Sequence, residues 1–267
     1  MPFSRRRLYA LFASLGTAGG LASPALAQSR PTRPARRPPL PLVVLDPGHG
    51  GRDPGTIGAR TGVHEKVITL AAAQELRRQL EGSGRCRVLL TRNRDIFIPL
   101  DERVAIARRR QAALFISLHA DSAPGARGAS VYTLNGNATD AMSAALARRE
   151  NNADRAGGLN LPPVSPEVAR ILISLVQAET REGSDRLARM AVTSLGETVP
   201  LLPNTHRQAG FAVLKAPDIP SVLVEMGFLS DPRDEAALRR PDHRARVAAA
   251  LSRGVQAYLA ATPTATG

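Results

Sequence analysis

The sequence predicts an α/β fold: a mostly parallel, twisted sheet flanked by helices on both faces, with a long helical insertion. Two observations predict it. Short apolar runs that favour buried strands alternate along the chain with longer segments whose apolar residues recur at helical spacing. In such a sheet, ligands bind beyond the carboxyl ends of the strands, so residues that directly follow a strand are the first candidates for a site.

The beginning of the chain is predicted to carry targeting information. Three arginines at 5–7 precede an apolar, uncharged stretch over 8–22, and residues 25–27 (Ala-Leu-Ala) fit the small-residue pattern of a cleavage site. Residues 1–27 are therefore predicted to be a signal peptide cleaved after Ala27, which would place the mature chain in the periplasm. The paired arginines fit twin-arginine export and a Sec signal with a basic start about equally well.

The remaining segments divide into a linker, one domain and a tail. The apolar stretch near the start is short and contains glycine, so it is less suited to a spanning helix than to a signal peptide. Once it is cleaved off, no stable membrane span is expected. Residues 28–41 hold five prolines and four arginines, which favours a stiff, extended linker. A single domain is predicted over 42–261, with a tail over 262–267.

The predicted strands and helices alternate along this domain. The first strand, 42–45, ends in a glycine-rich loop, and further strands are predicted at 88–90, 114–118, 130–134, 211–214 and 222–224. Residues 65–81 are predicted to be helical because apolar residues, Val67 and Leu76 among them, recur at roughly helical spacing. Residues 100–111 carry acids in the first turn and arginines in the last, as a helix dipole prefers. Helices are also expected over 140–199, with breaks, and over 242–260.

Composition limits the function without deciding it. The formal net charge of +13 suits an anionic partner such as a cell-wall polymer, a membrane surface or nucleic acid, and an arginine-rich genomic composition explains it about as well. Common RNA-binding signatures are missing and there is no tryptophan for base stacking, which disfavours nucleic acid. The single cysteine, Cys86, excludes an intramolecular disulfide and a cysteine-based zinc site, and is expected to be a buried structural thiol.

Four polar residues are predicted to gather at one edge of the sheet. His49 follows the first strand, His119 follows the third, Glu65 opens the first helix and Glu225 ends a late strand. Two imidazoles and a carboxylate form a standard catalytic zinc set with a fourth position left for water. Zinc lowers the pKa of that water towards neutrality, and a second carboxylate, here Glu225, can move its proton to a leaving amine.

Each of these residues also has a simpler interpretation. A histidine after a strand is more often a hydrogen-bonded loop residue than a metal ligand. Glu65 would suit any helix N-terminus, and Glu225 could pair with one of the many arginines. What favours a site is that all four lie at strand ends or a helix start on the same sheet edge.

Several short segments follow one another along the domain: residues 44–51 (Val-Leu-Asp-Pro-Gly-His-Gly-Gly), 53–55 (Asp-Pro-Gly), 65–66 (Glu-Lys), 89–92 (Leu-Leu-Thr-Arg), 117–121 (Ser-Leu-His-Ala-Asp) and 216–229. In content and order they resemble a known family, the zinc N-acetylmuramoyl-L-alanine amidases of the type that separates daughter cells. The resemblance implies that His49, Glu65 and His119 bind Zn²⁺ and that Glu225 is the catalytic carboxylate. It also implies the substrate, the peptidoglycan amide between muramic acid and L-alanine.

The chain departs from this family in two places. Many relatives carry an additional wall-binding domain before the catalytic one, where this chain has the Pro/Arg-rich linker. Relatives also tend to have a basic residue shortly before the Gln208-Ala209 pair, and no substrate contact is assigned to residues 203–208 here. His64 and His243 are predicted to be surface residues.

Two rival functions are weighed against the amidase. The same zinc set could serve a peptidase or hydrolysis of a different amide. A non-catalytic wall-binding or regulatory protein on the same fold is disfavoured, because such relatives usually lose a ligand or the catalytic glutamate and this chain keeps all four.

The helical insertion at about 136–199 is longer than a simple crossover requires, so it is expected to have a task of its own. Residues 147–154 resemble a segment of relatives in which a regulatory helix covers the active site, and Glu150 matches the glutamate that reaches the zinc there. The apolar run at 171–176 is the expected contact for a protein activator that displaces this helix. The alternative is that the insertion only covers the sheet and that Glu150 pairs with Arg148 or Arg149.

Overall fold

The computed structural model describes residues 39–157 and 166–262, with side chains given for most of residues 39–157, 171 and 180–262. The predicted signal peptide and nearly all of the predicted linker lie outside the described residues, as do the side chains at 172–176.

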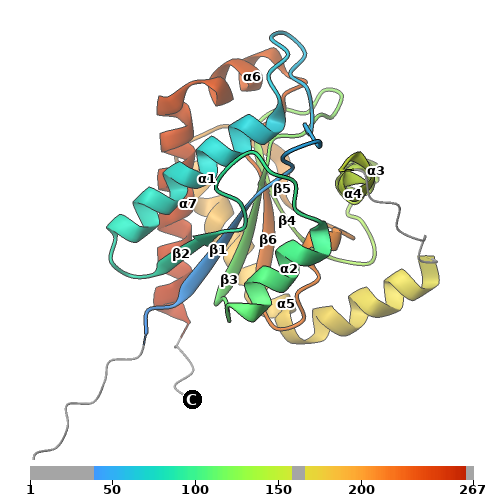
Figure 1. The fold of residues 1–267 in the computed structure, drawn as a ribbon, viewed down its shortest axis with the longest axis vertical. Helices are drawn as coiled ribbons and strands as arrows, with labels where there is room; N and C mark the ends of the chain where they lie inside the picture. The colour runs from blue at the N-terminus through green and yellow to red at the C-terminus, as the bar shows by residue number, and fades with distance from the viewer. Residues whose placement is uncertain (1–38, 158–165, 263–267) are drawn as a thin grey trace, which may run out of the picture. The chain divides into compact units, whose positions relative to one another are not determined.

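The described residues build one six-stranded sheet, drawn in Figure 1. Its strands are β1 (Leu42–Pro47), β2 (Arg87–Leu90), β3 (Leu114–His119), β4 (Ala129–Leu134), β5 (Leu201–Ala209) and β6 (Ser221–Glu225), in the order β2-β1-β3-β6-β4-β5. All neighbouring pairs are parallel except β4 with β6, which is antiparallel. The predicted α/β fold with a mostly parallel sheet is confirmed.

Helices cover both faces of this sheet. One face packs against α1 (Glu65–Gly82), α5 (Pro166–Gly196) and α7 (Pro241–Ala261) in a buried cluster that includes Val43, Ile116 and Val224. The opposite face buries Val44, Phe115 and other residues against α2 (Leu100–Arg109), α3 (Ala141–Glu150) and the 3₁₀ helix η1 (Ala212–Leu214). Successive residues of β1 and β3 alternate between the two clusters because strand side chains point to opposite faces.

One predicted strand is wrong. Residues 211–214 are not a strand: they follow β5 and contain η1, where Val213 and Leu214 are buried against the sheet. The strand in this part of the chain is instead the segment just before it, β5, which is the outermost strand next to β4. This segment is rich in polar residues because β5 pairs on one side only and lies at the sheet edge, so its sequence lacks the apolar run of a buried strand.

Two surface assignments also needed the three-dimensional packing. Helix α1 forms as predicted, but Val67 is 55% exposed, and Leu76 is among the residues that face the sheet. His243, expected at the surface, is buried, because it lies one helical turn before Val247 on the packed face of α7. His64 is exposed, as expected, and Cys86 is buried.

The helix α6 (Pro232–Arg239) was not predicted, although its start has a clear signal. Asp231 caps it by accepting hydrogen bonds from the backbone N–H groups of Arg233 and Asp234, and Pro232 occupies the first turn. Across residues 39–157 and 166–262, no helix has both the length and the apolar character needed to cross a bilayer.

The packing of α1 predicts unequal effects of two truncations on one helix. Leu76→Ala is expected to lower the free energy of unfolding by about 2–5 kcal/mol, because it leaves a cavity in the core. Val67→Ala, the matched control on the exposed side, is expected to change it by less than about 0.5 kcal/mol. Denaturant unfolding of both variants measures this, and equal losses would contradict the orientation of α1.

Candidate metal centre and active site

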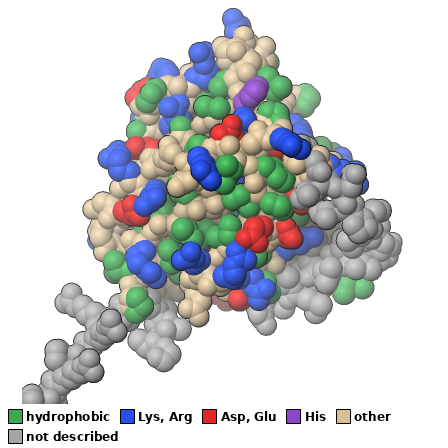
Figure 2. Space-filling model, viewed as in Figure 1, with side chains coloured by type: hydrophobic (Ala, Val, Ile, Leu, Met, Phe, Trp, Pro, Cys, Tyr) green, Lys and Arg blue, Asp and Glu red, His purple; other side chains and the backbone are tan. Residues whose placement is uncertain are grey.

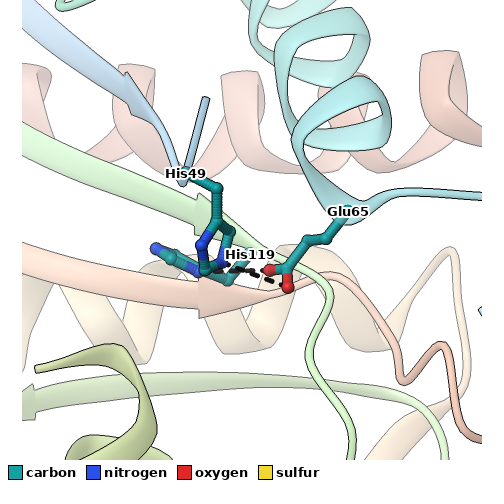
Figure 3. Close-up of side chains that lie close together, drawn as sticks. All are labelled: His49, Glu65 and His119. Atoms are coloured by element: carbon teal, nitrogen blue, oxygen red, sulfur yellow. Dashed lines mark hydrogen bonds and ion pairs between the residues drawn. The ribbon is translucent and has the colours of Figure 1, made fainter. Parts of the chain in front are cut away.

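Three side chains from separate elements meet at the carboxyl edge of the sheet. His49 lies just after β1, His119 ends β3 and Glu65 begins α1, and each offers a ligand atom within 4.8 Å of the other two. Figure 3 shows the two imidazoles and the carboxylate facing one another. Sequence reasoning placed these three residues at one edge, and the structure brings them together there.

The loop after β1 fixes His49. Its backbone has φ 64°, in the left-handed region, and its Nδ1 lies 2.8 Å from a carboxylate oxygen of Asp53. That contact leaves Nε2 directed at the cluster, where it is buried 3.1 Å from Glu65 Oε2 without a well-aligned hydrogen bond among the described residues. Glycine is required at two positions around it: a Cβ at Gly48 would lie 2.4 Å from His119, and one at Gly55 would lie 2.6 Å from His49.

Glu65 and His119 are held by the elements beside them. The two oxygens of Glu65 accept hydrogen bonds from the backbone N–H groups of Thr56 and Ala120. His119 Nδ1 lies 3.2 Å from Glu65 Oε1, and its Nε2 lies 3.2 Å from the Ser117 hydroxyl. Each imidazole therefore has one nitrogen in a supporting hydrogen bond and the other directed at the cluster.

The electrostatics of this cluster fit a bound cation. Burial lowers the pKa of His49, but Glu65, Glu150 and Asp53 outweigh it and raise that pKa to about 10. Burial opposes charge on Glu65 as well, yet the two histidines hold its pKa well below the usual range. A buried carboxylate between two imidazoles thus requires positive charge, which protons or a divalent cation can supply. The buried His49 Nε2, which lies beside carboxylate oxygens without a well-aligned hydrogen bond, and the two-histidine, one-carboxylate set fit zinc.

Glu225 ends β6 directly beside His119, its partner in the β3–β6 register. It is fully buried, its Oε2 accepts a hydrogen bond from the Asp121 backbone N–H, and its Oε1 has no partner among the described residues. Burial raises its pKa well above the usual value; His119 opposes the shift, and Asp121, Glu65 and Glu150 add to it. A buried carboxyl group whose pKa is raised can donate a proton as well as accept one.

A second buried carboxylate, Asp121, lies next to Glu225. Its Oδ1 accepts hydrogen bonds from the Thr56 hydroxyl at 2.6 Å and from Arg149 Nη1 at 2.8 Å. Burial and the charges of Glu150 and Glu65 raise its pKa to about 7. Sequence reasoning gave no role to Asp121 or Asp53, although both stand inside the segments that carry the family resemblance, and it considered Arg149 only as an alternative partner of Glu150.

Glu150, the last residue of α3, reaches the same centre. Its Oε2 lies 3.0 Å from His119 Nδ1 and 3.5 Å from His49 Nε2, and the residue is 4% exposed. Glu150 does not pair with Arg148 or Arg149, because Arg149 binds Asp121 instead. A cavity of about 270 Å³ adjoins the centre; its lining includes His49, Thr56 and Asp121, and, from the insertion, Arg149, Glu150, Asn152 and Ala153.

The sequence and the structure are both similar to known amidases. Residues 43–257 match the family described as N-acetylmuramoyl-L-alanine amidase. The amidase AmiC of Neisseria meningitidis is 42% identical over 241 residues, which cover 88% of this chain and 57% of that protein. AmiA of Escherichia coli is 41% identical over 221 residues, covering 82% of this chain and 76% of that protein. The chain thus spans little more than half the length of the AmiC relative.

Solved structures show the same fold. The amidase AmiC2 of Nostoc punctiforme superposes with a TM-score of 0.56 at 26% identity, covering 82% of this chain and 97% of that one. An amidase from Clostridium difficile gives a TM-score of 0.61 at 22% identity, covering 85% and 99% of the two chains, a likeness in fold alone.

The family match spans nearly the whole sheet and its helices, and relatives above 40% identity cover most of the chain. On this evidence, and as its motifs implied, the chain belongs to the N-acetylmuramoyl-L-alanine amidase family.

Proposed function

We propose that this chain hydrolyses the peptidoglycan amide between the lactyl group of N-acetylmuramic acid and the L-alanine of the stem peptide. The observation that carries the proposal is the convergence of His49, Glu65, His119 and Glu225 at one sheet edge in a member of this family. Both the substrate and the role in cell separation follow from the family resemblance.

The first three of these residues are proposed to hold Zn²⁺. When bound, zinc lowers the pKa of water towards neutrality and polarises the substrate carbonyl. Asp53 and Ser117 orient the two imidazoles through their other ring nitrogens, as residues around metal ligands commonly do. All three side chains are buried, which restricts the conformations that they can adopt.

Glu225 is proposed to move the proton. Water adds to the carbonyl carbon, and the Glu225 carboxylate takes a proton from it. The C–N bond then breaks, and the same proton passes from Glu225 to the leaving nitrogen of L-alanine. The hydrogen bond from Asp121 N–H fixes one oxygen of Glu225, which leaves Oε1 for this transfer.

Replacing the proton carrier should separate metal binding from catalysis. Glu225→Gln is expected to lose about 10²–10⁴-fold in turnover, the usual contribution of general acid–base catalysis, while it keeps the fold and the zinc. The measurement is release of L-alanine amino termini on intact stem peptides from purified peptidoglycan, together with metal analysis.

Two histidine variants complete the experiment. His119→Ala is expected to lose zinc as well as activity, whereas the exposed His64→Ala, which alters the neighbour of Glu65, should keep both. Near-normal turnover by Glu225→Gln would contradict its role. New ends other than L-alanine amino termini would favour the rival peptidase or a different amidase specificity.

The insertion is proposed to keep the enzyme inactive. The Glu150 carboxylate fills the space beside both imidazole nitrogens that water and substrate need. The residues on either side of Glu150 make contacts that hold the end of α3 in place. Arg149 donates to Asp121 and to the Ser122 carbonyl, and Asn151 exchanges two hydrogen bonds with the backbone of Gly210 and Ala212.

A partner protein is proposed to remove this block. The amidase CwlD of Clostridioides difficile, 23% identical in sequence, has been solved in complex with the lipoprotein GerS. In this chain the proposed contact is the apolar run at 171–176 of α5, where Ile171 is 60% exposed. A wall-cutting enzyme that is always active would endanger the cell, so a removable block has a clear use.

Weakening the block should activate the isolated protein. Glu150→Ala, or deletion of about residues 140–180, is expected to raise activity on peptidoglycan by about tenfold or more without a partner. Tenfold corresponds to ~1.4 kcal/mol, less than one charged hydrogen bond commonly contributes. Arg149→Ala should act in the same direction, and the exposed neighbour Arg148→Ala is the matched control that should change nothing. An intact protein already as active as the deletion would refute the block.

Export to the periplasm is also proposed, from the first 27 residues. N-terminal sequencing of secreted protein is expected to give Gln28. If export follows the twin-arginine route, changing Arg5 and Arg6 together to lysine should leave the precursor in the cytoplasm. Unimpaired export of that double variant would point to the Sec route, and an uncleaved N-terminus would contradict the signal peptide.

A further inference from the structure

One fully buried carboxylate, Asp46 on β1, is not part of the metal centre and has no part in the reaction proposed above. Its Oδ1 accepts hydrogen bonds from the Thr91 hydroxyl at 2.6 Å and from Arg103 Nη1 at 3.0 Å. Its Oδ2 accepts a hydrogen bond from the Ser117 hydroxyl at 2.8 Å. Asp46 and Arg103 are each 1% exposed at the side chain, so this is an ion pair removed from water.

The hydrogen bond from Ser117 to Asp46 bears on His119. Asp46 is ionised, because burial, which raises its pKa, is outweighed by Arg103, Thr91 and Ser117. A carboxylate can only accept hydrogen bonds, so Ser117 must donate its single proton to Asp46. The same hydroxyl lies 3.2 Å from His119 Nε2 and therefore has only acceptor capacity left for that contact. His119 must then carry a proton on Nε2, so that Nδ1, which faces Glu65 and Glu150, is the nitrogen that can bind a metal.

The ion pair of Asp46 with Arg103 bears on His49. Arg103 Nη1 also donates to the Pro47 carbonyl at 3.1 Å, and Nη2 donates to the His49 carbonyl at 2.9 Å. His49 is in the left-handed backbone region, which an ordinary L-residue adopts at a cost and keeps only where its surroundings enforce it. The guanidinium enforces it here, because Asp46 holds that group beneath the loop.

We propose that Asp46 is a positioning residue for both histidines of the metal centre, acting through Ser117 on the tautomer of His119 and through Arg103 on the backbone of His49. The proposal rests on the zinc site of the proposed function. It explains why a charged pair lies buried beneath the centre, where an apolar pair of similar volume would stabilise the fold equally well or better.

The experiment cuts the Ser117 branch by itself and measures zinc affinity directly. Ser117→Ala breaks the link to His119 and leaves the Asp46–Arg103 pair. It is expected to weaken zinc binding by about 10–100-fold in competition with a chromophoric chelator, the usual effect of removing a group that orients a metal ligand. Ser221→Ala is the matched control: another buried serine, on the neighbouring strand β6, whose hydroxyl bonds to the Ile219 carbonyl instead. It should bind zinc as the unchanged chain does.

A double variant tests whether Ser117 acts through Asp46. Asp46→Asn is expected to weaken zinc binding more than Ser117→Ala, because it disturbs both branches. The combined loss in Asp46→Asn with Ser117→Ala should be smaller than the two single losses multiplied together. The absorption spectrum of the cobalt(II)-substituted chain should change in Ser117→Ala and not in Ser221→Ala, which separates a change at the metal from a general loss of stability.

Two outcomes would overturn the proposal: wild-type zinc affinity in Ser117→Ala, or losses in the double variant that multiply independently. Failure of the proposed function is a different result, in which the unchanged chain itself binds no zinc or releases no L-alanine termini. An unchanged chain that binds zinc and cuts peptidoglycan, with a Ser117→Ala variant equal to it, overturns only the positioning role.

Discussion

The parallel register of β1, β3 and β6 is the constraint on which the rest of the site depends. Parallel strands end at the same edge, so residues from distant parts of the sequence meet there. The register pairs His119 with Glu225, and the Gly48 N–H donates to the Leu118 carbonyl, which fixes the loop of His49 beside β3. A change of register by one residue would turn these side chains to the other face of the sheet.

That convergence concentrates charge away from water. Glu65, Glu225 and Asp121 are all fully buried within one small region, close to two histidines. Buried charge of one sign destabilises a fold unless it is compensated, and the pKa shifts of these groups report that imbalance. The guanidinium of Arg149 reduces it at Asp121, and the proposed zinc ion would reduce it further. The chemical requirements of the proposed reaction and the electrostatic requirements of folding are therefore met by the same groups.

The same electrostatics explain why α3 rests where it does. A helix that places an arginine on Asp121 and a glutamate beside two imidazoles satisfies a charged pocket that would otherwise face solvent. The ion pair with Asp121 is partly exposed, since the Arg149 side chain is 44% exposed, whereas Leu146 and Ala147 of the same helix are buried against the sheet. On the face in Figure 2, the basic side chains of the described residues are scattered among acidic ones, so their charge pattern on this face does not single out a partner.

Sequence alone determined the features that depend on local pattern. Apolar runs identified β1, β3 and β6, and the position of His49, His119 and Glu225 after those runs placed them at one edge, because the carboxyl end of a parallel strand has a fixed place in the sheet. Tertiary structure decided what depends on contacts between distant segments. The edge strand β5 has little apolar character to signal it, and the burial of His243 follows from the packing of α7. Many arginines were available to the buried carboxylates. The packing of helices and loops decided that Arg149 binds Asp121 and that Arg103 binds Asp46, because an ion pair depends on spatial proximity and not on spacing along the chain.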